Sequence, residues 1–143
     1  MAYTTIDDPT IYFNTTIYTG NGGTQTITHD GSNLQADMIW VKSRGNTNAH
    51  QISNTVSGLT KVLETNDQGA ENTVTNGVTS VGANNFALGS NSYYNQNSIN
   101  FVSWNWLAGG SASSNSDGDV TSSVSANTTA GFSIITYTGT GNI

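Results

Sequence analysis

Short segments in which apolar and polar residues alternate run through this chain, and a Gly or Asn closes most of them. Alternation of this kind predicts half-buried β-strands joined by tight turns. Thr, Ser, Asn and Gly supply the polarity, because charged residues make up only 8% of the 143 residues. Leu, Glu, Lys and Arg, which favour helices, are scarce. The sequence therefore predicts an all-β fold, an antiparallel sandwich of two sheets.

Two segments are the strongest strand candidates, Asp37–Arg44 and Ser98–Gly110. Each carries apolar side chains on both of its faces, which is typical of a strand covered on both sides. The first contains Trp40, and the second contains Trp104 and Trp106. We expect the two strands to lie opposite each other across the core. We also expect the three indoles to lie inside that core.

The sequence divides into four segments by composition. Pro9, the single proline, favours extended backbone at the residue before it, and a stretch nearly free of large apolar residues follows Gly109-Gly110. The predicted segments are an extended N-terminal arm (1–16), the sandwich core (17–110), a polar linker (111–131) with one thin strand at Val120–Ser125, and a final strand (132–143).

The N-terminal arm has the composition of a docking segment. The arm carries three apolar side chains, those of Ile11, Tyr12 and Phe13. They predict that the arm docks on its own domain or on a neighbour. A frayed terminus is the alternative. The residues expected to dock are Asp7, Asp8, Pro9, Ile11, Tyr12 and Phe13.

Net charge and cysteine content exclude several functions. The chain carries −6 overall, and its three cations are Lys42, Arg44 and Lys61. So few cations cannot neutralise nucleic-acid phosphates or bind an anionic membrane surface. No apolar run reaches the roughly 20 residues of a membrane span, and the N-terminus does not resemble a signal peptide, so we expect synthesis in the cytoplasm. The absence of cysteine excludes disulfides and thiolate metal sites.

No arrangement of side chains predicts catalysis. The nine carboxylates do not form the alternating cluster that a sandwich-fold glucanase places on one strand. His29 and His50 lack a Ser-Asp frame, and the chain has no nucleophile elbow, zinc-protease motif or phosphate-binding loop. We therefore expect a protein that is not an enzyme and needs no cofactor.

Asn115–Val120, with the sequence NSDGDV, is the candidate metal site. Asp117 and Asp119 flank Gly118, and carboxylates on a tight turn suit Ca²⁺. An EF-hand loop would need a Glu further along, and the chain has none there. A plain Asp-Gly turn without an ion is the alternative.

Ser90–Ser98, with the sequence SNSYYNQNS, is the candidate carbohydrate site. Aromatic rings flanked by amides are typical of sugar-binding surfaces. Since neighbouring residues of a strand point to opposite faces, only one of the two tyrosines needs to point outward. A polar hairpin loop or a subunit contact are the alternatives. The expected sugar contacts are Tyr93, Tyr94, Asn95 and Asn97.

The chain ends on nearly the same phrase with which its first strand begins. Ile17–Gly23 reads IYTGNGG and Ile135–Ile143 reads ITYTGTGNI, with Tyr18 and Tyr137 lying 119 residues apart. The full run FVSWNWLAGGSASSNSDGDVTSSVSANTTAGFSIITYTGTG, together with the N-terminal residues and DMIWVKSR, resembles a family of virion proteins of marine and cyanobacterial phages. Members are usually described as tail-fibre or structural proteins.

This resemblance implies repeated domains similar to concanavalin A-like jelly rolls, with a further repeat beginning near Phe132. The final strand would then complete a sheet in its own domain or in a neighbour's. The implied function is a structural subunit of the tail, in a fibre or its base, that supports host attachment. Its implied partners are other tail proteins and copies of itself, as a homotrimer. Carbohydrate binding to a host polysaccharide and capsid decoration are the alternatives.

Overall fold

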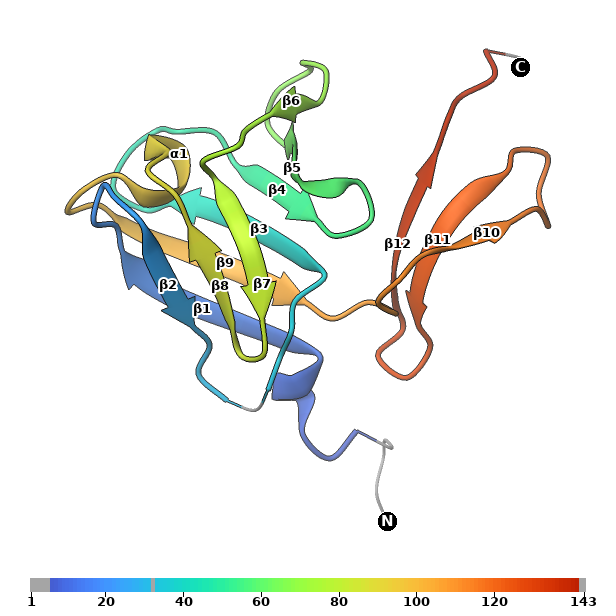
Figure 1. The fold of residues 1–143 in the computed structure, drawn as a ribbon, viewed down its shortest axis with the longest axis horizontal. Helices are drawn as coiled ribbons and strands as arrows, with labels where there is room; N and C mark the ends of the chain where they lie inside the picture. The colour runs from blue at the N-terminus through green and yellow to red at the C-terminus, as the bar shows by residue number, and fades with distance from the viewer. Residues whose placement is uncertain (1–5, 32, 142–143) are drawn as a thin grey trace.

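The computed structural model describes residues 6–31 and 33–141, and most of their regular structure is β-strand (Figure 1). All strand pairs in these residues are antiparallel, and two sheets stack face to face. The prediction of an all-β antiparallel sandwich is confirmed. Helix in the described part is limited to one 3-10 turn, η1 (Pro9–Ile11), and α1 (Ser92–Asn95). Neither helix has the length and apolar character needed to cross a membrane.

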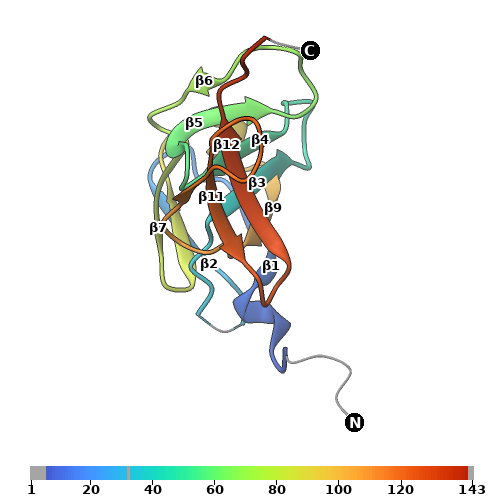
Figure 2. The same ribbon diagram turned by 90° about the vertical axis from the view of Figure 1, so that its right-hand side faces the viewer.

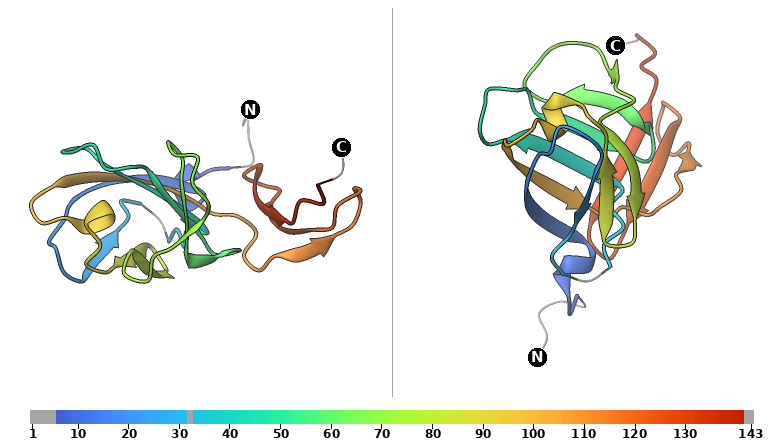
Figure 3. Two further views of the ribbon diagram at one scale, coloured as in Figure 1. Left: turned by 90° about the horizontal axis from the view of Figure 1, so that it is seen from above. Right: turned by 60° about the vertical axis from the view of Figure 1, so that its left-hand side comes forward.

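A six-stranded sheet forms the first layer of the sandwich. Its spatial order is β1 (Phe13–Thr19), β9 (Asn100–Trp106), β3 (Met38–Ser43), β4 (Gln51–Asn54), β5 (Gly58–Glu64) and β6 (Asn72–Thr73). A three-stranded sheet forms the second layer, in the order β2 (Gln25–Thr28), β8 (Asn85–Leu88) and β7 (Val78–Gly82). The left panel of Figure 3 shows the two layers nearly edge-on.

The core lies between these two layers. Tyr18 of β1 stacks on Phe101 of β9, with ring centroids 5.3 Å apart, and meets the edge of Phe86 of β8 at 6.2 Å. Such pairs add to the free energy gained from burying the rings. Ile39 and Val41 of β3 point to the same interior. The other members of the core cluster are Ile27, Leu34, Ala36, Val62, Val78, Leu88 and Tyr94.

A third sheet stands beside the sandwich, where the sequence predicted a linker (Figures 1 and 2). Its strands are β10 (Ser113–Asn115), β11 (Ser122–Asn127) and β12 (Phe132–Tyr137), in that order. The prediction of a linker at 111–131 is wrong, because β10 and β11 lie in this segment and pair with β12 in one sheet. The thin strand expected at Val120–Ser125 begins and ends two residues later. The final strand pairs with β11 of its own chain.

The joint between sandwich and third sheet follows β9 directly. The Asp37 carboxylate accepts hydrogen bonds from the backbone N–H of Ala108 at 2.9 Å and of Gly110 at 3.3 Å. The Ser125 hydroxyl of β11 accepts from Gly109 N–H at 2.9 Å and donates to Gly110 O at 2.7 Å. A Cβ at Gly109 would collide with the β11 backbone. The Asp37 carboxylate, the Ser125 hydroxyl and the missing side chain at Gly109 therefore all contribute to this joint.

The predicted N-terminal arm is too long, because β1 begins at Phe13 rather than after residue 16. Residues 13–16 pair in register with 103–106 of β9, since Asn14 and Thr16 continue the inward alternation of Tyr18. Before them, Asp8 has the extended backbone predicted from Pro9 and caps η1, accepting from the Thr10 N–H at 2.9 Å. Residues 1–5 of the predicted arm lie outside the described residues.

Candidate interaction face

The outer surface of the six-stranded sheet, turned away from the β2-β8-β7 sheet, is rich in apolar and aromatic side chains. Trp104 and Trp106 lie on it because Phe101, three positions before Trp104, points into the core, and residues an odd number apart on a strand face opposite sides. Trp40 of β3 lies on it for the same reason. The prediction that the indoles lie in the core is therefore wrong. We call this surface the outer face; its apolar residues are Phe13, Ile17, Met38, Trp40, Ile52, Leu63, Val102, Trp104 and Trp106.

Polar side chains occupy the inward positions that oppose the tryptophans. Asn105, between Trp104 and Trp106, is fully buried. Its Nδ2 donates to Asn14 O at 3.1 Å and to the Ser103 hydroxyl at 3.1 Å. Buried amides are tolerated when they are hydrogen-bonded in this way. This end of the sheet is therefore polar inside and aromatic outside, the reverse of the usual pattern.

One row of the outer face crosses five strands. The strand register places Thr15, Trp104, Trp40, Ile52 and Leu63 side by side. The Trp40 and Trp104 rings pack at 5.5 Å between centroids and 59° between planes. Leu63 at the end of the row remains 50% exposed. Contiguous apolar surface of this kind is typical of interaction sites, which makes the outer face a candidate for one.

A histidine holds Trp40 in place at the centre of this row. The Trp40 indole Nε1–H donates to Nδ1 of His50 across 2.9 Å, and the two rings pack at 5.6 Å. This bond needs an unprotonated Nδ1. Partial burial, followed by the positive charge of Lys42, lowers the pKa of His50 below its ordinary value. The neutral imidazole is thus favoured at neutral pH.

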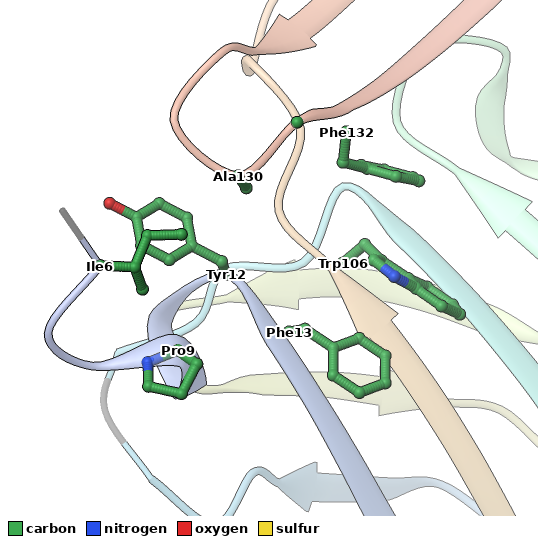
Figure 4. Close-up of a pocket in the computed structure, with 8 residues that line it drawn as sticks. Ile6, Pro9, Tyr12, Phe13, Trp106, Ala130 and Phe132 are labelled. Carbon is green, nitrogen blue, oxygen red and sulfur yellow. The ribbon is translucent and has the colours of Figure 1, made fainter. Parts of the chain in front are cut away.

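An apolar groove of about 340 Å³ opens at the edge of the outer face (Figure 4). Phe13 and Trp106 pack at 4.9 Å between centroids, and Trp106 stacks on Phe132 of β12 at 5.9 Å and 20°. Figure 4 shows Ile6 and Tyr12 beside each other on the opposite wall. The groove therefore lies between β1, the segment before it and the β11–β12 turn. Its lining is completed by Pro9, Ala130 and Gly131.

The predicted docking residues divide between this groove and local structure. Pro9, Tyr12 and Phe13 line the groove. Asp8 instead serves as the cap of η1, with Thr10 Oγ1 donating to it at 2.6 Å. Asp7 is exposed and Ile11 is half-buried within η1. Docking by these residues remains a prediction.

The predicted carbohydrate site is split between surface and interior. Tyr93 is 40% exposed, whereas Tyr94 is fully buried in the core. The backbone carbonyl of Tyr94 accepts from the Tyr18 hydroxyl at 2.7 Å, and its own hydroxyl lies 3.3 Å from Ser53 Oγ. Burial raises the pKa of Tyr94 to about 12. Tyr94 is a core residue and cannot be a surface sugar contact, which corrects that part of the prediction.

Asn95 is likewise a structural residue. It is fully buried, and its Nδ2 donates to Asn21 Oδ1, Gly23 O and Gly89 O at 2.8 to 3.0 Å, while its Oδ1 accepts from Asn21 N–H. It joins the β1–β2 turn to the segment before α1. Asn97 is exposed. Only Tyr93 and Asn97 of the four predicted sugar contacts therefore lie at the surface.

The predicted metal residues Asp117 and Asp119 lie exposed between β10 and β11. Asp117 is held by Asn115, whose Nδ2 donates to Asp117 Oδ2 at 3.0 Å and whose Oδ1 accepts from Asp117 N–H at 3.2 Å. Among the described residues, no three His, Cys, Asp or Glu side chains gather where they could hold an ion. Calcium binding stays a prediction.

The family to which the chain belongs is shown by sequence comparison. The profile of a family described as a domain of unknown function (DUF7483) matches residues 8–143. The chain belongs to this family. The match includes β1, both layers of the sandwich and the third sheet, so the outer face and all of the groove lining except Ile6 lie within the family's domain. No curated protein and no solved structure matches the chain.

Proposed function

We propose that this chain is a structural subunit of a phage virion, in a tail fibre or its base, and that it carries out no reaction. The outer face and the groove would bind other tail proteins and further copies of the chain. The observation that carries this proposal is the apolar row from Trp104 to Leu63, which no element of the described chain covers. Its sequence resemblance to phage tail proteins supplies the virion context.

The chemistry of the surface supports an assembly role. Neutral hydroxyl and amide side chains lose little free energy when water is removed from them, compared with Lys or Glu. Copies can therefore pack closely without strong repulsion between like charges. The exposed edges of the sheets also favour assembly, because their unpaired backbone N–H and C=O groups can pair with a strand of another chain.

Two charge variants test the use of the outer face. The first variant, Ile17→Glu, places a charge on the outer face. Ile17 is 64% exposed on β1, so the new carboxylate is not buried in the free chain. Thr79→Glu, on the exposed side of β7, is the matched control. We expect sedimentation velocity to show that Ile17→Glu weakens self-association while Thr79→Glu does not. Equal association of both variants would show that the outer face is not the contact.

Particle location tests the virion role. Gold-labelled antibody against the chain, viewed by electron microscopy on purified phage, is expected to mark the tail. Labelling of the head would instead favour capsid decoration. If a phage expresses the chain but its purified particles carry no label, both the tail role and the capsid role are refuted.

Carbohydrate binding is the second candidate, favoured by the partly exposed Trp40 and Trp104 rings on an open sheet face. Indole faces stack on sugar rings, and Asn54 in the neighbouring row offers an amide. Titration with host lipopolysaccharide distinguishes this function from the first. We expect binding to be lost in Trp104→Ala and kept in Tyr93→Ala if the outer face is the site. The opposite result would place the site at Ser90–Ser98.

A further inference from the structure

The final strand is a second version of the first strand. Residues 132–141 match residues 13–22 at five of ten positions: Phe, Tyr, Thr and two Gly. The correspondence extends to backbone conformation, because Gly22 has φ +73° and Gly141 has φ +71°. Both segments form a strand that ends close to the first matched glycine: β1 ends at Thr19, directly before Gly20, and β12 ends at Tyr137, two residues before Gly139. Sequence and conformation therefore repeat together.

The two strands differ in what covers them. In β1, Tyr18 is 8% exposed and stacks on Phe101. Its counterpart in β12, Tyr137, is 71% exposed, and Ile135 on the same side is 55% exposed. β12 thus presents to solvent the side that β1 presents to the core.

The glycines indicate the surroundings that this second strand fits. A Cβ at Gly20 would collide with the backbone carbonyl of Gln96, so the β1 position requires glycine there. The counterpart, Gly139, has no described atom within 4 Å of where its Cβ would be, and its φ is not positive. Its own surroundings therefore do not require glycine, whereas the surroundings of β1 do.

We propose that residues 132–141 bind in the β1 position of a second copy of this chain. β1 is an edge strand whose ladder partner is β9, and it lies close to the N-terminus. Its release therefore breaks one ladder, whereas release of an inner strand of this sheet would break two. Exchange of an element between copies is a low-cost route to association. Neither segment contains a charged residue, so electrostatic repulsion does not oppose the exchange. This inference is independent of the virion role.

Two inward positions fit less well than the tyrosine and the glycines. Ser133 takes the place of the buried Asn14, whose Nδ2 donates to Asp30 O. Ile135 takes the place of Thr16, whose hydroxyl lies 3.0 Å from Nδ1 of the buried His29. The exchanged strand leaves that nitrogen without its hydroxyl partner. In dilute protein, each chain's own β1 therefore occupies the position beside β9. Exchange with the final strand of another copy requires the high protein concentration of an assembly.

Cysteine cross-linking tests the proposal, because the chain has no cysteine of its own. Thr19 faces Asn100 across the β1–β9 ladder, and Thr138 is the counterpart of Thr19. Full-length Thr138→Cys and Asn100→Cys chains are mixed at high concentration and oxidised. We expect a disulfide-linked mixed dimer. Thr138→Cys mixed with Asn72→Cys, on the far edge of the sheet, is the control and should give none. A mixture that gives no more dimer than this control overturns the proposal.

Three further variants, each added to the Thr138→Cys chain, link the dimer to the β1 position. Gly139→Ala should leave thermal unfolding unchanged but abolish the dimer, whereas Gly118→Ala, equally free of described neighbours, should preserve it. Ile135→Thr restores a hydroxyl for His29 and should raise the yield. A dimer that forms as well with Gly139→Ala refutes binding in the β1 position.

Discussion

The indole N–H of Trp40 donates to Nδ1 of His50 across 2.9 Å, on the outer face of the six-stranded sheet. This single bond couples the aromatic row of the outer face to a titratable group. Protonation of His50 removes the acceptor, so Trp40 loses its partner in acid. The outer face therefore contains a group that responds to pH.

The Trp40 indole N–H resonance should move with pH, with a midpoint below the ordinary histidine pKa of about 6.5. Burial and Lys42 lower the pKa of His50, so the unfolded chain binds the proton first as the pH falls. The contribution of neutral His50 to the free energy of unfolding is therefore present above pH 6.5 and is lost as the pH falls below it. Proton–nitrogen NMR spectra measure the resonance. His50→Gln should abolish the shift, whereas a shift that survives in it would contradict this assignment.

Asn95→Ala should lower the free energy of unfolding by about 2–3 kcal/mol, because it leaves several buried groups without partners. The groups affected are the carbonyls of Gly23 and Gly89 and the backbone N–H of Asn21. Asn97→Ala, at the surface, is the control and should change it by less than about 0.5 kcal/mol. Urea unfolding measures both. Similar losses in the two variants would show that the Asn95 network is not what holds this region.

Asp37→Asn should lower stability by about 1.5–3 kcal/mol, because hydrogen bonds to a charged carboxylate are stronger than those to an amide. Its Oδ2 accepts from Ala108 and Gly110, and its Oδ1 accepts from the Thr55 hydroxyl at 2.9 Å. Hydrogen exchange should become faster at the amides of Ala108 and Gly110. Faster exchange throughout the sandwich instead would mean that the carboxylate does not act locally at the joint.

Alkaline pH should destabilise the chain. Burial raises the pKa of Tyr18 and Tyr94, so the unfolded chain loses these protons first as the pH rises. Stability is full below the ordinary tyrosine pKa of about 10 and falls above it. Urea unfolding at pH 9 and pH 11 measures the loss. Tyr18→Phe should reduce this pH dependence and cost about 1–2 kcal/mol at pH 8 from the bond to Tyr94 O. An unchanged pH dependence in this variant would refute the role of Tyr18.

The strand pattern could be predicted because alternation is local. Asp37–Arg44 and Ser98–Gly110 contain β3 and β9 as expected. The expectation that these strands lie opposite each other across the core is wrong, because they are paired neighbours in the six-stranded sheet. The presence of large apolar residues on both sides of β9 does not by itself decide which side faces the core, since Trp104 and Trp106 compete with Phe101 for the interior. The orientation of β9 depends on hydrogen bonds that exist only in the folded chain. The Asn105 side chain donates to Asn14 O, on a distant segment, and to the Ser103 hydroxyl.

Other errors have similar causes. The segment around Tyr93 forms a helical turn because Asn91 caps it, accepting from Tyr93 N–H at 2.9 Å. Asn at that position is a recognisable helix-start signal. The signal for the outer face was also present, as the polar residues between the tryptophans of β9. The third sheet gave a weaker signal, because strands such as Ser113–Asn115 contain no large apolar residue.

The outer face has a consequence for the conditions under which the chain works. Contacts made by indole rings, aliphatic side chains and amides have little Coulomb energy for dissolved ions to screen. Partners held there would stay bound in dilute buffer and in concentrated brine alike. Cooling would loosen them instead, since the attraction between apolar surfaces weakens at low temperature.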